Sequence, residues 1–129
     1  MSRLFLLAAG GGIGTVFRYL LSAFADRAAG GAFPAGTMLV NLGGSFLIGC
    51  LWGLFERGSL SPNARLFLMT GVLGGFTTFS TFTLENFSLL RDGEFKLAAA
   101  NMLISNIAGL VLVFAGFKGA GFALNGGLR

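Results

Sequence analysis

Four long apolar runs joined by short linkers constrain this chain more than any other feature of its sequence. They lie near residues 4–25, 35–55, 66–90 and 97–117. Each is long enough to cross the roughly 30 Å hydrocarbon core of a bilayer, which takes about 20 apolar residues in a helix. Because the runs take up nearly all of the 129 residues, no soluble domain fits beside them. The sequence predicts a single all-α membrane domain over residues 1–129 with four transmembrane helices.

The composition excludes several classes of protein. Only 11% of the residues are charged and 54% are hydrophobic, whereas soluble domains carry about 25% charged residues. The net charge of +4 comes from nine scattered basic residues, which suit helix ends near lipid headgroups better than a nucleic-acid surface. The chain has no histidine, the commonest general base and metal ligand. An enzyme is therefore not expected.

The basic residues outside the spans give only a weak signal for orientation. Five of them fall on one side of the membrane, namely Arg3, Arg57, Arg65, Lys118 and Arg129. Three fall on the other side, namely Arg27, Arg91 and Lys96. The positive-inside rule orients a chain by such a difference. Five against three leaves two possibilities open: one fixed topology with cytoplasmic termini, or insertion in both orientations with antiparallel pairing.

Polar side chains form stripes on two of the predicted spans. In the second span Thr37, Asn41 and Ser45 recur at every fourth position, which places them on one helix face. In the fourth span Asn101 and Ser105 repeat this spacing. Such stripes either form hydrogen bonds between helices, worth about 0.6 kcal/mol each, or line a polar pathway.

Two charged residues, Arg18 and Glu85, lie inside the first and third spans. These spans run parallel, and the two charges are expected at a similar depth. They either form a structural ion pair or belong to a vestibule and pore that attract ions.

Four helices of this length enclose little space for polar side chains, so a second subunit is expected to shield them from lipid. Three GxxxG pairs would let helix backbones approach closely. They are Gly10/Gly14, Gly49/Gly53 and Gly71/Gly75. The pairs favour close packing without showing which helices meet.

The third span holds the most unusual string, GVLGGFTTFSTF at residues 71–82. A helix break at the pair Gly74-Gly75 would free backbone carbonyls, which suit a hard cation. Unwound backbone inside a membrane is tolerated only within protein or beside a cavity. The phenylalanines that follow alternate with hydroxyl residues, and the positive edges of their rings could hold a small anion. The string therefore predicts an ion pathway beside a broken helix.

Three motifs occur in order along the chain: GGIG at 11–14 followed by Arg18-Tyr19, NLGGSF at 41–46, and GGFTTFSTF at 74–82. Through them the sequence resembles the CrcB/Fluc family of fluoride channels over nearly its whole length. The resemblance implies a multi-pass protein of the cell (inner or plasma) membrane that exports fluoride passively and gives fluoride resistance. It also implies an antiparallel, dual-topology homodimer whose third helix is broken at mid-membrane.

The resemblance also assigns roles to individual residues. The fluoride pore would be lined by Asn41, Phe79, Ser80, Thr81, Phe82 and Ser105. Arg18 and Glu85 match charged positions of the vestibule and pore. Backbone carbonyls of Gly74 and Thr77 from both subunits would hold a structural sodium ion. Some members carry a tyrosine and two serines on the fourth span, where this chain has Asn101, Ser105 and Gly109.

Two other functions remain open from the residues themselves. Small proton-coupled multidrug-type exporters are also short four-span, dual-topology dimers, but they rely on a carboxylate in the first span. This chain has Arg18 there, so Glu85 of the third span would have to substitute. An assembly subunit of a larger membrane complex would explain the GxxxG pairs but not the hydroxyls clustered beside a helix break.

Overall fold

A computed structural model describes residues 2–30 and 33–126, all in helices and short connections. The elements are α1 (Ser2–Ala28), α2 (Ala35–Glu56), α3 (Pro62–Arg65), η1 (Leu66–Leu73), α4 (Gly74–Phe76), α5 (Phe79–Arg91) and α6 (Phe95–Gly126). Four helical stretches of this part of the chain are long and apolar enough to cross a membrane: α1, α2, the run from α3 to α5, and α6. This confirms the predicted all-α chain with four potential spans.

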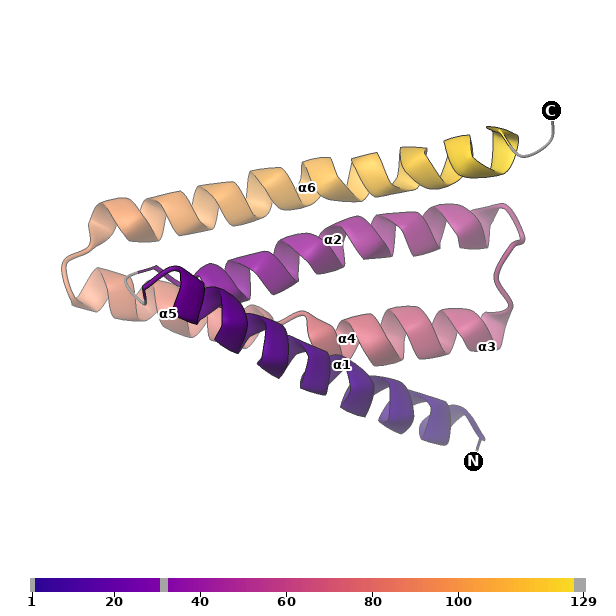
Figure 1. Cartoon of the computed structure of the whole chain (residues 1–129), viewed down its shortest axis with the longest axis horizontal. Coiled ribbons are helices and arrows are strands. Elements are labelled where there is room, and N and C mark those ends of the chain that lie inside the picture. The colour runs from indigo at the N-terminus through magenta and orange to yellow at the C-terminus, as the bar shows by residue number, and fades with distance from the viewer. Residues whose placement is uncertain (1, 31–32, 127–129) are drawn as a thin grey trace.

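The helices form an elongated bundle with two distinct ends (Figure 1). At one end, which we call the terminus end, α1 begins, α2 connects to α3, and α6 finishes. At the opposite end α1 leads into α2, and α5 turns into α6. All four stretches therefore run from one end of the bundle to the other.

Helix α1 packs against η1 through facing glycines. A Cβ atom added to Gly14 would overlap the carbonyl oxygen of Val72, and one added to Gly10 would lie 2.8 Å from the carbonyl oxygen of Phe67. A Cβ on Gly71 would lie 3.1 Å from the Cα of Gly10. Two of the GxxxG pairs thus serve packing inside one subunit, where the absence of side chains lets the two backbones touch.

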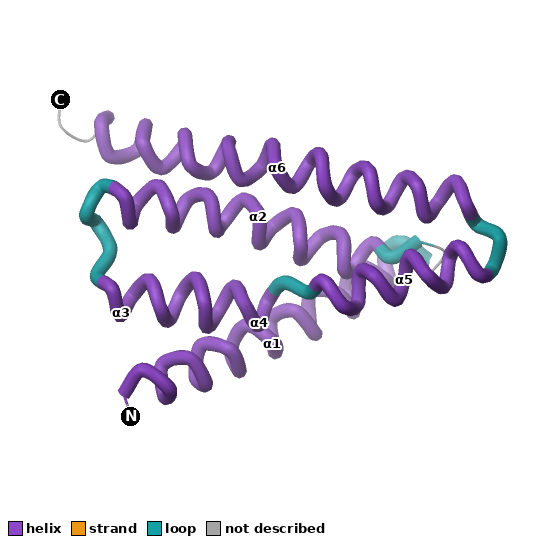
Figure 2. Tube along the Cα trace, turned by 180° about the vertical axis from the view of Figure 1, so that it is seen from behind, coloured by secondary structure: helices purple, strands orange, loops and turns teal. Residues whose placement is uncertain are grey.

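The third glycine pair packs against α6, which lies alongside α2 in both views (Figures 1 and 2). A Cβ on Gly49 would overlap the carbonyl oxygen of Val113, and one on Gly53 would lie 3.0 Å from that of Phe117. From the other side, a Cβ on Gly116 of α6 would overlap the carbonyl oxygen of Phe46. Small residues on both helices therefore set the short distance between them.

Little of the apolar surface is buried inside the subunit. In the described part of the chain the buried apolar side chains are Val40, Leu73, Ala98 and Ala120. Many large side chains point outward instead, as expected where lipid or another subunit covers the helices. Three polar side chains, those of Thr37, Asn86 and Asn101, are nevertheless buried.

Candidate functional site

The third span is interrupted between α4 and α5, where Thr77 and Thr78 are extended (Figure 2). Thr77 has φ −84° and ψ 159°, and Thr78 has φ −149° and ψ 122°. The glycines Gly74 and Gly75, at which the sequence places the break, are themselves helical in α4. Glycine only weakens a helix, whereas threonine hydroxyls compete for its backbone hydrogen bonds.

Those hydroxyls end one helix and begin the next. The hydroxyl of Thr77 donates to the carbonyl oxygen of Leu73 at 2.9 Å. The hydroxyl of Thr78 accepts from the backbone N–H of Thr81 at 3.3 Å, which makes Thr78 the N-cap of α5. An N-cap residue has extended backbone and satisfies one of the first N–H groups of its helix. The local sequence thus explains why a new helix starts at Phe79.

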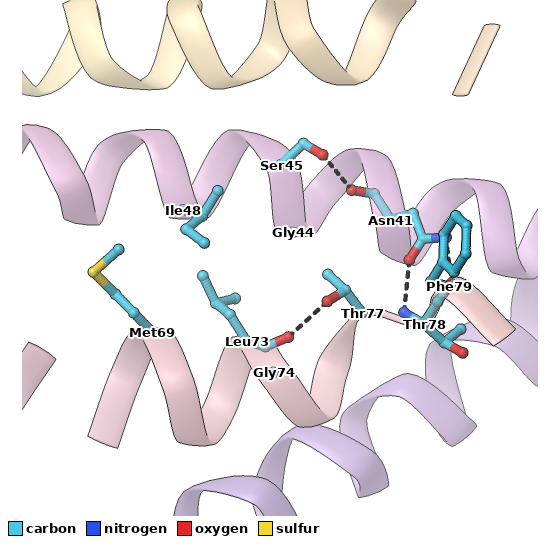
Figure 3. A pocket seen from close by; sticks show the side chains of 10 residues that line it. All are labelled: Asn41, Gly44, Ser45, Ile48, Met69, Leu73, Gly74, Thr77, Thr78 and Phe79. Carbon is cyan, nitrogen blue, oxygen red and sulfur yellow. Dashed lines mark hydrogen bonds between the residues drawn. The ribbon is translucent and has the colours of Figure 1, made fainter. Parts of the chain in front are cut away.

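Asn41 of α2 reaches across to the interruption with both ends of its amide (Figure 3). Its Nδ2 donates to the carbonyl oxygen of Thr78 at 2.9 Å, and its Oδ1 accepts from the N–H of Thr78 at 2.8 Å. Unpaired backbone groups are costly inside a membrane. The Asn41 side chain therefore gives the N–H of Thr78 the acceptor that it loses where the helix stops, and adds a donor to the carbonyl of Thr78, which as the N-cap carbonyl also accepts the first bond of α5.

The same contacts release two carbonyl groups. In an unbroken α-helix the N–H of Thr78 would bond to Gly74 O, and the N–H of Thr81 would bond to Thr77 O. Here these two donors bond instead to Asn41 Oδ1 and to the Thr78 hydroxyl. The space beside Gly74 is open, since a Cβ added there would meet nothing within 4 Å. Gly74 and Thr77 therefore offer carbonyl oxygens of the kind that bind a hard cation.

A cavity of about 360 Å³ lies along the interruption (Figure 3). Its lining comes from α2, η1, α4 and the start of α5: Asn41, Gly44, Ser45, Ile48, Met69, Leu73, Gly74, Thr77, Thr78 and Phe79. Phe79 is 79% exposed, and its ring centre lies 6.1 Å from that of Phe82 with the planes tilted by 38°. The cavity thus combines an exposed aromatic ring with hydroxyl, amide and backbone groups.

A second cavity, of about 450 Å³, lies between α1, the start of α2 and α5. Arg18, Thr37, Thr78, Thr81 and Glu85 are among its lining residues. The hydroxyl of Thr37 donates to Oε1 of Glu85 at 2.6 Å. Arg18 and Glu85 face the same space, but no ion pair joins them in the described structure. Thr78 lines both cavities, so the interruption lies between them.

A chain of buried amides links α5 to α6. Asn101, which is 1% exposed, donates through Nδ2 to Oδ1 of Asn86 at 3.2 Å. Asn86 in turn donates to the carbonyl oxygen of Phe82 at 2.7 Å, and Ser105 donates to Oδ1 of Asn101 at 3.3 Å. The polar stripe of the fourth span was expected either to form hydrogen bonds between helices or to line a polar pathway. Asn101 forms a hydrogen bond between helices. Its partner Asn86 was not singled out by the sequence, although a third-span amide beside Glu85 was a usable signal.

The structure brings most of the predicted site residues to these two cavities. Asn41, Gly74, Thr77 and Phe79 line the first, and Arg18, Thr81 and Glu85 line the second. Ser80, Phe82 and Ser105 line neither cavity within this subunit. Thr78 was missed as an individual residue, and its signal was a threonine at the N-cap position of a helix.

Comparison with known protein families supplies the decisive observation. The family described as "CrcB-like protein, Camphor Resistance (CrcB)" matches residues 5–117. The chain belongs to the CrcB-like family. Together with its four apolar helices, this membership makes the chain an integral, multi-pass membrane protein.

Individual CrcB-like relatives are similar over nearly their full length. The chain is 50% identical to a protein of Agrobacterium fabrum, with 90% of this chain and 94% of the relative covered. It is 48% identical to a protein of Parabacteroides distasonis, with 90% and 91% covered. It is 44% identical to a protein of Aquifex aeolicus, with 91% and 95% covered. Each of these relatives is named "Fluoride-specific ion channel FluC".

Proposed function

We propose that this protein is a fluoride-selective ion channel that exports fluoride passively and so gives fluoride resistance. The observation that carries the proposal is the interrupted third span, where Asn41 binds the extended peptide of Thr78 beside the exposed ring of Phe79. The relatives at 44–50% identity bear the name of fluoride-specific channels. An interrupted, polar segment has no advantage in a span that serves only as an anchor.

The chemistry at the interruption suits a small anion. Fluoride is strongly hydrated, so a selective pore must replace its water with closely set donors. The amide of Asn41 has two N–H groups, of which one goes to Thr78 O and the other is available to an anion. Hydroxyl groups of Ser80, Thr81 and Ser105 and the positive ring edges of Phe79 and Phe82 would continue the path.

A second copy of the chain would complete the site. Phe79 is mostly exposed in one subunit, and Ser105 lines neither cavity of its own subunit. We assign to this protein an antiparallel, dual-topology homodimer with the interruption at mid-membrane. The partner would then cover the open cavity and bring its own α6 to the path, which removes polar surface from lipid.

The carbonyl groups of Gly74 and Thr77 would hold a structural sodium ion between the two subunits. Both oxygens have lost their usual helical donors, and the space beside Gly74 is open. A bound sodium ion would supply positive charge near the anion path. Replacing sodium by N-methylglucamine during reconstitution is expected to lower fluoride efflux, and full efflux in its absence would contradict this assignment.

The physiological role follows from the acid chemistry of fluoride. Hydrogen fluoride crosses a membrane as a neutral molecule and ionises in the less acidic interior, where the anion accumulates. A passive path for the anion alone would let it leave down its gradient. Arg18, in the cavity behind the interruption, would offer a positive charge to an anion near the path; the carboxylates of Asp26 and Glu85 line the same cavity, and that of Glu85 is held by Thr37.

Fluoride efflux from liposomes that contain the purified protein tests the proposal, with chloride as the comparison anion. The variants Phe79→Ile and Asn41→Asp should lower efflux by at least tenfold, since the first removes a ring edge and the second replaces an N–H donor with a negative charge. Phe5→Ile, on an exposed ring in the first turns of α1, is the control and should leave efflux unchanged.

The result should not depend on a proton gradient. Fluoride-selective efflux without such a gradient, lost in the two site variants, would support a passive channel. Efflux only with an imposed proton gradient would favour the proton-coupled exporter. No efflux from a correctly folded dimer would reject the channel.

A further inference from the structure

The two ends of the bundle differ in charge. Within residues 3–30 and 33–122, the terminus end carries four basic residues and one acidic residue, namely Arg3, Arg57, Arg65, Lys118 and Glu56. The opposite end carries three of each, namely Arg27, Arg91, Lys96, Asp26, Asp92 and Glu94. The terminus end is therefore electropositive, and the opposite end is balanced.

Two of the basic residues at the terminus end have contacts at the ends of α2 and α6. Arg57 donates through Nη1 to the carbonyl oxygen of Gly53 at 2.7 Å and lies over the ring of Phe117. This contact caps the end of α2, where carbonyl groups lack helical donors. Lys118 lies over the ring of Phe114 on α6. Arg3 and Arg65 remain as the two arginines that line a common space.

That space is a cavity of about 340 Å³ between the start of α1, the end of α2 and the start of the third span. Arg3, Asn63, Arg65 and Thr70 supply its polar lining, and Phe55 and Leu66 supply apolar surface. Among the described residues there is a single ion pair, between Arg91 and Asp92 at the opposite end of the bundle. Neither arginine of the cavity therefore has a carboxylate partner there.

Stacking holds the side chain of Arg65 in place. Its guanidinium carbon lies 4.5 Å from the ring centre of Phe55 and 5.1 Å from that of Trp52. This cation–π contact uses no hydrogen bond, and the guanidinium group of Arg65 makes none in the described structure, so its N–H donors remain for a ligand. Trp52 is itself held by a hydrogen bond from Nε1 to Oε1 of Glu56 at 2.8 Å.

We propose that this cavity binds the phosphate group of an anionic phospholipid. Two guanidinium groups present planar sets of N–H donors that match phosphate oxygens. Arg3 and Arg65 lie at the ends of two spans, at the level where headgroups meet the hydrocarbon. Phe55 and Leu66 offer apolar surface to the adjoining lipid. A zwitterionic lipid would bring its own cation beside the two arginines, so the site selects a headgroup with net negative charge.

Trp52 provides a direct test, since it is the single tryptophan of the chain and lies beside Arg65. Its fluorescence would be followed while the full-length protein in detergent is titrated with short-chain phosphatidylglycerol, phosphatidylcholine or inorganic phosphate. We expect a saturable change with phosphatidylglycerol. Arg3→Gln should weaken apparent affinity at least tenfold, and Arg27→Gln, at the other end of the same helix, should leave it unchanged.

Three results would overturn the proposal. Equal titrations in Arg3→Gln and wild type would show that the cavity is not the binding site. An equal response to phosphatidylcholine would show that net charge is not recognised. Saturation by inorganic phosphate at the same concentration as the lipid would assign the cavity to free phosphate.

Circular dichroism and gel filtration establish that the variants are folded. Arg65→Lys, measured by lipid retained in native mass spectrometry, should also bind less because it loses the planar donor set.

Discussion

At the scale of single residues, Asn41 acts as a substitute for a peptide group. Its amide offers one donor and one acceptor to Thr78, as a neighbouring strand would in a sheet. This arrangement lets a helix stop inside a membrane without leaving the N–H of Thr78 unpaired. A side chain with only a donor or only an acceptor could bond to the C=O or to the N–H of Thr78, but not to both.

Asn41→Ala should therefore lower stability substantially. A backbone group left without a partner inside a membrane costs about 1–3 kcal/mol, and this change leaves the N–H of Thr78 without its acceptor. Ser45→Ala is the control, because its hydroxyl only adds a bond to the carbonyl oxygen of Asn41. Thermal unfolding of both variants in detergent measures the difference. An equal midpoint for the two variants would show that Asn41 does not support the interruption.

The Asn86–Asn101 pair allows a double-mutant cycle. Replacing either residue with leucine leaves the other amide without its partner between α5 and α6, whereas replacing both removes the need for a partner. Each single variant should be destabilised by about 1–3 kcal/mol, and the double variant by less than the sum. Chemical unfolding of the four proteins gives the coupling, which averages about 0.6 kcal/mol between membrane helices. Additive effects would mean that the two amides do not interact.

At the scale of elements, hydrophobicity and length were enough to predict the helices, since a span must be long, apolar and helical. The contacts between helices were harder to predict. Periodicity placed Asn101 and Ser105 on one face of the fourth span, but it gave no information on which helix faces them. Asn101 meets Asn86, a residue only 15 positions away across a tight turn. Likewise, a GxxxG pair indicates that another helix packs closely against it, but not which helix that is.

The interruption illustrates a second limit. The sequence pointed to Gly74 and Gly75, because glycine is the poorest helix former apart from proline. Both stay helical, and the extended residues are Thr77 and Thr78. The position of the break is set by hydrogen bonds that Thr78 forms with Asn41 and with Thr81. Asn41 is 37 positions away from Thr78 in the sequence. Local propensity cannot include that distant partner.

The packing of α1 on η1 predicts different effects on stability for two glycine-to-alanine substitutions in α1. Gly14→Ala should destabilise the protein, because the added Cβ would overlap the carbonyl oxygen of Val72 and force the helices apart. Gly12→Ala meets nothing within 4 Å and should be neutral or stabilising, since alanine favours a helix by about 1 kcal/mol over glycine. Thermal unfolding in detergent compares the two. Equal effects would argue against this helix contact.

At the scale of the whole molecule, the number of basic residues on each side governs how the chain inserts. The sequence gives five outside the spans on the side of the terminus end, Arg129 included, and three on the side of the opposite end. Acidic residues contribute little to orientation, so the electropositive terminus end does not by itself fix the topology. A difference of two basic residues is a weak bias and is compatible with insertion both ways, as an antiparallel dimer requires.

Shifting this balance in both directions tests the assembly as a whole. Asp92→Lys and Glu94→Lys, combined with Lys118→Gln and Arg129→Gln, give five basic residues at the opposite end against three at the terminus end, and should place the opposite end in the cytoplasm. Ser59→Lys with Arg27→Gln gives six at the terminus end and two opposite, and should give the reverse topology. A reporter fused to the C-terminus reads out each orientation.

If the channel is an antiparallel homodimer, chains that all insert one way cannot pair. Each biased variant alone should then fail to protect a fluoride-sensitive bacterium, while the two expressed together should restore growth close to that given by the unmodified chain. Restoration is the critical result, because it shows that neither set of substitutions damages the pore and that the loss comes from a missing opposite partner. Full protection by either variant alone would mean that a working channel forms from chains of one orientation. The dimer would then be parallel, and the weak charge bias would have no role in assembly.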